Sequence, residues 1–144
     1  MGDGQKIDGQ CLCGAVTIAA IVDAPTLVAC HCGMCQRQNG GPYISIMTRQ
    51  EGIEADGPIA VFKSSDWAER AFCSTCGSTL WYGTLHDGAR YLSSGLFADA
   101  AGAPLALEYF SDNCPQGYMF KGDHRRMTEA ETIAAFTEGG EPGV

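Results

Sequence analysis

Eight cysteines in a chain of 144 residues constrain its fold more than any other feature of the sequence. Seven of them form three groups with different spacings: Cys11 and Cys13 in GQCLCGAV, Cys30, Cys32 and Cys35 in CHCGMCQRQNGG, and Cys73 and Cys76 in FCSTCGSTLWY. Thiols at intervals of two and three residues are typical of zinc sites. A fold that completes such sites must bring distant segments together, so these spacings restrict the possible topologies.

The redox state of the cysteines depends on the compartment. The N-terminal stretch MGDGQKIDGQ has neither the basic start nor the apolar run of a secretory signal peptide, so we expect a cytoplasmic location. In a reducing compartment, clustered cysteines are more often metal ligands or nucleophiles than disulfide partners. The even number of cysteines is compatible with a disulfide framework, but that is the weaker interpretation.

Charge and hydropathy exclude two classes of partner. With 9 Lys and Arg against 17 Asp and Glu, the formal net charge is −8, which repels phosphate backbones, so no nucleic-acid partner is expected. No apolar run approaches the ~20 residues of a membrane span, so no membrane partner is expected either. The sequence leaves a homo-oligomer possible.

Short alternating stretches separated by turn residues predict a mainly β fold. In AVTIAAIV, residues 15–22, the side chains of Val16, Ile18, Ala20 and Val22 share one face, as in a half-buried strand. Further strands are predicted at residues 43–48, 59–64, 69–73, 79–82, 90–94 and 105–111. A helix is predicted at 128–136, where Thr128 and Glu131 form a capping box, and a short helical turn is expected after Cys35. We expect one domain over 9–138 between a flexible N-terminus, 1–8, and a flexible tail, 139–144.

The C-x-x-C-G turn of Cys73 and Cys76 follows a predicted strand, which is the zinc-knuckle arrangement. Gly77 can adopt the positive φ that such a turn requires. A redox C-x-x-C is the alternative, but it favours a helix after the second cysteine, whereas a β-type stretch follows here. Cys11 and Cys13 project from the same face of an extended segment, so they can complete a structural zinc site with this pair.

Cys30, Cys32 and Cys35 can hold a second zinc ion with three thiolates. Three protein ligands and one exchangeable position are typical of catalytic zinc. Alternatively, Cys114 in the turn SDNCPQGY, or His31, closes the tetrahedron and makes a second structural site. The side chain of His31 points away from its neighbours in an extended run, so a packed, hydrogen-bonded histidine is expected. Spacing alone leaves the open and closed sites as alternatives.

In their order and spacing, the three cysteine blocks resemble the GFA family of glutathione-dependent formaldehyde-activating enzymes, grouped with centromere protein V. YLSSGLFADAAGAPLALEYFSDN continues the likeness, which covers about residues 9–120. The resemblance implies an Mss4-like (β-tent) fold of short antiparallel sheets with a small C-terminal helix. It also implies two zinc ions per chain. The structural ion is assigned to Cys11, Cys13, Cys73 and Cys76, and the catalytic ion, with an open fourth position, to Cys30, Cys32 and Cys35.

The activity implied by this resemblance is that of a zinc-dependent carbon–sulfur lyase, similar to S-(hydroxymethyl)glutathione synthase. It would act on a small thiol of the glutathione kind and a small aldehyde or related electrophile. Relatives often carry a basic pair directly after the third cysteine, whereas this chain has Gln36 and then Arg37, the nearest candidate to bind a glutathione carboxylate.

Two other functional classes are considered. One is a non-enzymatic, zinc-stabilised binding module, and the other is a redox or methionine-sulfoxide-type reductase with Cys114 as its nucleophile. Two further histidines, His86 and His124, lie in polar, turn-like sequence and are expected at the surface.

Overall fold

The structure is a computed structural model that describes residues 4–137 of the chain. Within these residues it contains eleven β-strands, two α-helices and three short 3₁₀ helices, so the mainly β class is confirmed. The chain divides into two compact units, whose described residues are 4–25 with 45–103, and 26–44 with 104–137. We call them the first and second unit and describe each by itself.

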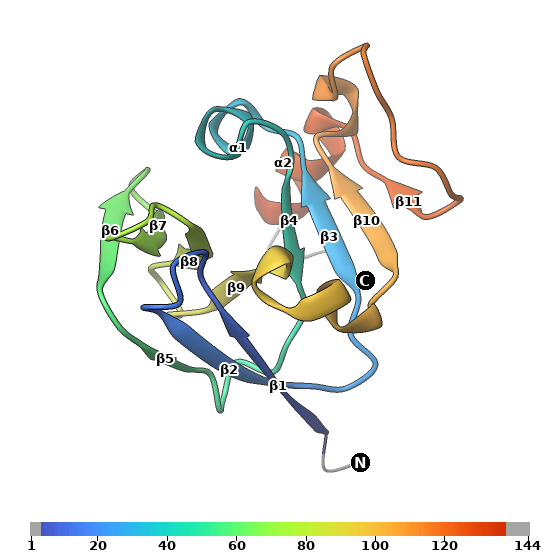
Figure 1. Cartoon of the computed structure of the whole chain (residues 1–144). Helices are drawn as coiled ribbons and strands as arrows, with labels where there is room; N and C mark the ends of the chain where they lie inside the picture. The colour runs from blue at the N-terminus through green and yellow to red at the C-terminus, as the bar shows by residue number, and fades with distance from the viewer. Residues whose placement is uncertain (1–3, 138–144) are drawn as a thin grey trace. The chain divides into compact units, whose positions relative to one another are not determined.

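A three-stranded antiparallel sheet begins the first unit (Figure 1). Its central strand is β2 (Thr17–Val22), flanked by β1 (Gln5–Gln10) and β5 (Glu54–Asp56). Alternate residues of β2 are buried (Ile18, Ala20 and Val22), as the hydrophobic pattern predicted. Residues 5–8 of the segment expected as a flexible N-terminus lie in β1. The pairing of Gln10 with Thr17 leaves residues 11–16 as the connecting loop, which carries the first two cysteines.

An antiparallel run of strands completes the first unit. It consists of β6 (Ile59–Lys63), β7 (Ala68–Cys73), β8 (Thr79–Thr84) and β9 (Arg90–Ser93), with each strand paired to the next. Two 3₁₀ helices, η1 (Ser94–Leu96) and η2 (Ala98–Gly102), follow β9. The turn between β7 and β8 carries the zinc-knuckle sequence predicted above.

The second unit places β10 (Leu105–Tyr109) between β3 (Leu27–Cys30) and β11 (Arg125–Arg126) (Figure 1). Both pairings are parallel, so the expectation of antiparallel strands is wrong for this unit. The long stretch of chain between β3 and β10 provides the crossover that a parallel pair needs. The helices of this unit are α1 (Gly33–Asn39), η3 (Ser111–Asn113) and α2 (Glu129–Thr137).

The strand β4 (Tyr43–Ile46) crosses the boundary between the units in the sequence, and its last two residues, Ser45 and Ile46, belong to the first unit and pair with β9. The predicted strands correspond to β2, β4 and β6–β10, while β1, β3, β5 and β11 are additional.

No helix among residues 4–137 has the length and apolar character to span a bilayer. The predicted tail, 139–144, lies outside the described residues.

Both predicted helices are present, with ends set by their caps. In α2, the Thr128 N–H donates to Glu131 Oε1 (2.9 Å) and the Glu131 N–H to Thr128 Oγ1 (3.2 Å), which is the predicted capping box. The helical turn expected after Cys35 begins earlier, at Gly33, because Cys32 caps α1: its sulfur accepts the Cys35 N–H. A metal-ligand candidate therefore also starts the helix.

Candidate metal centres

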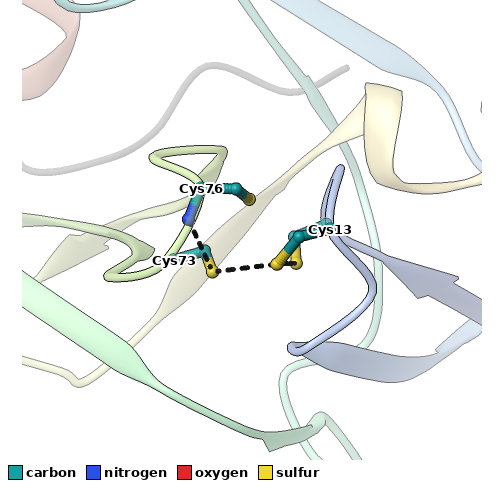
Figure 2. A group of neighbouring side chains, drawn as sticks. Cys13, Cys73 and Cys76 are labelled. Carbon is teal, nitrogen blue, oxygen red and sulfur yellow. Dashed lines mark hydrogen bonds between the residues drawn. The ribbon is translucent and has the colours of Figure 1, made fainter.

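Four cysteines converge in the first unit, and we call them the four-cysteine cluster. Cys11 and Cys13 lie on the loop after β1, Cys73 ends β7, and Cys76 lies on the following turn. All four sulfur atoms are within 4.8 Å of one another. Figure 2 shows the sulfurs of Cys13, Cys73 and Cys76 turned toward one another. The cysteine spacing predicted that these four residues lie together, and the structure brings them together.

The spacing of these sulfurs fits zinc. A tetrahedral ion with Zn–S bonds of about 2.3 Å places its ligand sulfurs about 3.8 Å apart. The Cys11 and Cys13 sulfurs are 3.6 Å apart, and those of Cys13 and Cys73 are 3.9 Å apart. Four thiols in this arrangement can surround an ion completely, as in a structural site.

Main-chain N–H groups and one hydroxyl support the four-cysteine cluster. Val16 donates to the Cys11 sulfur (3.3 Å) and Cys76 to the Cys73 sulfur (3.4 Å). The Ser78 hydroxyl accepts the Leu12 N–H (3.0 Å) and lies 3.2 Å from the Cys76 sulfur. Ser78 thus links the loop after β1 to the turn after β7. This role of Ser78 cannot be predicted from the sequence, because a serine after C-x-x-C-G carries no distinctive signal.

Thiol ionisation in the four-cysteine cluster is uneven. The hydrogen bond with the Ser78 hydroxyl is the main reason that the pKa of Cys76 falls to about 5. Although the Ala15 N–H lowers it, desolvation and the neighbouring thiols raise the pKa of Cys13 to about 11. One thiol that ionises readily therefore opposes the ionisation of the next. A bound cation removes this opposition, so the donor set fits a metal ion.

The second group, which we call the three-cysteine cluster, lies in the second unit. Cys30 ends β3, Cys32 caps α1, and Cys35 is buried on α1. Their sulfurs also lie within 4.8 Å of one another. The Cys35 N–H donates to the Cys32 sulfur (3.4 Å), as Cys76 does to Cys73. Both C-x-x-C sequences therefore form the same local turn.

Thiol ionisation in the three-cysteine cluster also fits a bound cation. Hydrogen bonding with Cys32, followed by the effects of Cys35 and burial, raises the pKa of Cys30. Neutral thiols can share this space, whereas several thiolates require a positive ion between them. Three sulfurs fit a zinc ion that has three protein ligands.

Neither alternative fourth ligand joins this cluster among the residues that the structure describes. His31 is fully buried and its Nε2 lies 2.6 Å from Glu108 Oε1, so the prediction of a packed, hydrogen-bonded histidine is confirmed. The Cys114 sulfur donates to the Tyr118 carbonyl (3.4 Å), and burial together with the charge of Glu108 raises its pKa.

A buried carboxylate, that of Glu108 on β10, lies at the centre of a polar network in the second unit. One oxygen accepts from His31, and the other contacts His124 Nε2 and Arg126 Nε, the latter at 3.2 Å. Burial raises the pKa of Glu108, but hydrogen bonds from His124 and His31 outweigh that effect and bring the pKa below its usual range.

The prediction that His124 lies at the surface is wrong. Its side chain contacts the buried carboxylate of Glu108 and is only 5% exposed. His86 is exposed, as predicted.

The remaining candidate, Arg37, is exposed on α1, two residues after Cys35. Its guanidinium lies beside Gly33, at the start of the same helix. Gln36, directly before it, is half-buried and faces the protein: its Nε2 donates to the carbonyls of His31 (2.6 Å) and Asn113 (3.1 Å). Of the pair that follows the third cysteine, one residue is thus bound to the main chain and the other is exposed to solvent.

The chain is similar to known proteins in sequence and in fold. A family model described as "Glutathione-dependent formaldehyde-activating enzyme" matches residues 6–113. A Schizosaccharomyces pombe protein, described as "Uncharacterized lyase C29B12.13", is 26% identical over 135 residues, which are 92% of this chain and 98% of that protein. The crystal structure of a Rhodobacter sphaeroides protein is similar in fold, with a TM-score of 0.52 and 20% identity, over 69% of this chain and 100% of that one.

Proposed function

The chain belongs to the glutathione-dependent formaldehyde-activating enzyme (GFA) family, and we propose that it is a zinc-dependent carbon–sulfur lyase. Its substrates in this proposal are a small thiol of the glutathione kind and a small aldehyde or related electrophile. The observation that carries the proposal is the three-cysteine cluster, to which no fourth ligand belongs among residues 4–137. Three thiolate ligands leave one position for an exchangeable molecule. The relative described as a lyase adds support.

The two clusters have different roles in this proposal. Cys11, Cys13, Cys73 and Cys76 would hold a structural zinc ion, while Cys30, Cys32 and Cys35 would hold the catalytic one. When bound there, zinc supplies positive charge that stabilises a substrate thiolate or a developing oxyanion. The protein's contribution would be to supply three sulfur ligands, those of Cys30, Cys32 and Cys35, and to leave one coordination position for substrate.

The proposed reaction is a reversible addition. The thiol sulfur forms a bond to the carbonyl carbon, the C=O π bond breaks, and the thiol proton is transferred to the oxygen. Nothing is oxidised or reduced, and the reverse reaction breaks the C–S bond to regenerate the aldehyde. The reaction therefore needs placement of two substrates and stabilisation of one negative charge.

Arg37 is our proposed site for a substrate carboxylate. A guanidinium binds carboxylates through paired N–H donors, and glutathione carries two carboxylates. Arg37 lies on α1, two residues after the cluster residue Cys35, and its side chain is exposed to solvent. Because the chain has a net charge of −8, a local positive charge is needed to attract an anionic thiol.

Exchange spectroscopy by NMR tests the proposed activity. Glutathione and ¹³C-formaldehyde combine spontaneously, so the measured quantity is the rate of exchange between free aldehyde and adduct above background. We expect the wild type to accelerate exchange and Cys32→Ser to leave it at background. Cys114→Ser is the matched control, since its sulfur lies outside both clusters, and should retain the wild-type rate.

The same data separate the other functional classes. Equal rates with wild type and Cys32→Ser would overturn the proposed lyase activity. Two bound zinc ions without any acceleration would favour a zinc-stabilised binding module. Loss of a reductase activity in Cys114→Ser, with Cys32→Ser unaffected, would favour the redox alternative.

A further inference from the structure

We propose that Glu108 and Gln36 are positioning residues for the three-cysteine cluster. Neither is a candidate ligand. Both hold His31, which lies between Cys30 and Cys32 in the sequence, and they do so through different parts of that residue. The inference rests on the proposed function in one respect, namely that this cluster is a metal site.

The side chain of His31 is held by Glu108. Its Nε2 lies 2.6 Å from Glu108 Oε1, and both side chains are almost completely buried. A carboxylate accepts hydrogen bonds and does not donate them, so Nε2 carries the proton and the orientation of the ring is defined. A charged acceptor makes this bond stronger than one between neutral groups.

Glu108 is itself fixed by the segment that leads into β11. His124 and Arg126 both contact its second oxygen. Arg126 Nη2 also donates to the carbonyls of Phe120 (2.9 Å) and Gly122 (3.1 Å). The ring of Phe120 lies 5.7 Å from that of His31, centroid to centroid. The carboxylate is therefore held from two sides, and its position determines that of His31.

The main chain of His31 is held in addition. Its N–H donates to the Tyr109 carbonyl (3.1 Å) on β10, and its carbonyl accepts from Gln36 Nε2 (2.6 Å). Because Gln36 directly follows Cys35, this bond fixes the helix that carries Cys35 to the residue between Cys30, which ends β3, and Cys32, which caps α1. The same amide nitrogen reaches the carbonyl of Asn113 (3.1 Å), which anchors α1 to η3.

These contacts keep the three sulfurs together by bonds that do not involve the metal. Partners outside the ligand shell typically change metal affinity by 10–100-fold. A site with only three protein ligands depends more on such support, since it has one metal–protein bond fewer than a site with four. In this inference, the hydrogen bonds of Glu108 and Gln36 to His31 fix the positions of the ligands in place of that fourth bond.

Zinc affinity, measured by competition with a chromophoric chelator, tests this inference without reference to activity. The variants are Glu108→Gln, which removes the charge, and Gln36→Ala, which removes the bond to the His31 carbonyl. Thr132→Val is the matched control in the same unit: its buried hydroxyl donates to the Thr128 carbonyl (2.8 Å) and accepts the Phe110 N–H (3.3 Å), and neither bond involves His31.

We expect Glu108→Gln to bind the weaker of its two zinc ions roughly 10–100-fold less tightly, and Gln36→Ala to show a smaller loss. The tighter ion should be unaffected, and Thr132→Val should lower the melting temperature while leaving both affinities unchanged. Unchanged affinity in Glu108→Gln and Gln36→Ala would overturn the inference, as would an equal loss in Thr132→Val. Should Glu108→Gln fail to fold, Gln36→Ala decides, because it changes a half-buried residue of a short helix.

The outcome for the wild type separates this inference from the proposed function. A wild-type chain that binds a single zinc ion would overturn the proposed lyase, and the positioning role with it. Two ions in the wild type, bound with the same affinities in Glu108→Gln and Gln36→Ala, would overturn the positioning role alone.

Discussion

The two cysteine clusters use the same turn but are completed differently. In both, the second cysteine of a C-x-x-C sequence donates its N–H to the sulfur of the first at 3.4 Å. The four-cysteine cluster adds Cys11 and Cys13, from a loop about sixty residues earlier in the chain. The three-cysteine cluster adds only Cys30, two residues before its turn. One cluster therefore joins distant segments, whereas the other stays at a single strand–helix junction.

This difference indicates what holds each cluster in place. In the four-cysteine cluster, the direct links from the loop after β1 to the turn after β7 are a hydroxyl and thiol contacts, so an ion would provide most of the attachment. In the three-cysteine cluster, hydrogen bonds from Glu108 and Gln36 fix the intervening residue. We therefore expect metal to stabilise the first unit and to serve chemistry in the second.

The largest effect is expected from removing a ligand of the four-cysteine cluster. Structural zinc contributes roughly 10–16 kcal/mol of apparent binding free energy in small domains, comparable to or above the whole stability of a typical domain. Cys73→Ser should therefore unfold the first unit, seen as loss of amide protection in β7 and β8 by hydrogen exchange. Cys35→Ser, the matched variant of the other cluster, should keep that protection. Equal protection in both variants would remove the proposed distinction between the clusters.

Chelation should separate the two clusters in a single titration. The three-cysteine cluster has one ligand fewer, so we expect it to release zinc at a roughly tenfold or more lower chelator concentration. Thiol–aldehyde exchange should disappear with this first ion while far-ultraviolet circular dichroism stays constant. The second ion should leave together with the signal of the β-strands. Simultaneous release of both ions would indicate that the clusters are not independent.

Both cysteine clusters and several elements of the fold could be predicted from the sequence, because the spacing of ligands and of buried side chains is a local property. The intervals between cysteines defined both clusters, and the alternation in residues 15–22 defined β2. The capping box of Thr128 and Glu131 correctly predicted α2. Each of these signals lies within about ten residues of sequence.

The supporting residues could not be predicted in the same way. Glu108 is 77 residues from His31 in sequence, and Ser78 is 66 residues from Leu12. Their partners are chosen by strand pairing, and the parallel pairing of β3 with β10 was itself not anticipated. The position of His124 was predicted wrongly because a buried histidine needs a hydrogen-bond partner, and its partner, Glu108, lies 16 residues away in the sequence.

A smaller effect is expected from Ser78→Ala, which removes the hydroxyl that links the two loops of the four-cysteine cluster. Losing its contacts with the Leu12 N–H and the Cys76 sulfur should lower the stability of the first unit by about 1–3 kcal/mol. Urea unfolding followed by tryptophan fluorescence measures this change, since both tryptophans, Trp67 and Trp81, lie in the first unit. Ser74→Ala is the control in the same turn, since its hydroxyl donates to the Pro58 carbonyl (3.2 Å) and not to the loop after β1. A loss in Ser74→Ala as large as in Ser78→Ala would show that the link itself is unimportant.

The smallest effect concerns the second unit, whose stability we attribute to hydrogen bonds and capping and not to metal. The Thr128 N–H lowers the pKa of Glu131, so the charged carboxylate stabilises α2 above the ordinary pKa of glutamate, about 4.3, and this contribution is lost as the pH falls through the lower folded-state value. Glu131→Gln keeps the capping oxygen but removes the charge. The melting temperatures of the two proteins should therefore differ slightly at pH 7 and converge as the pH falls below the lowered folded-state pKa of Glu131. Because Glu131 is remote from the cysteines in sequence, the difference at pH 7 should be the same with and without chelator at the concentration that empties only the three-cysteine cluster. A difference that vanishes on chelation would mean that the metal, and not the cap, stabilises this helix.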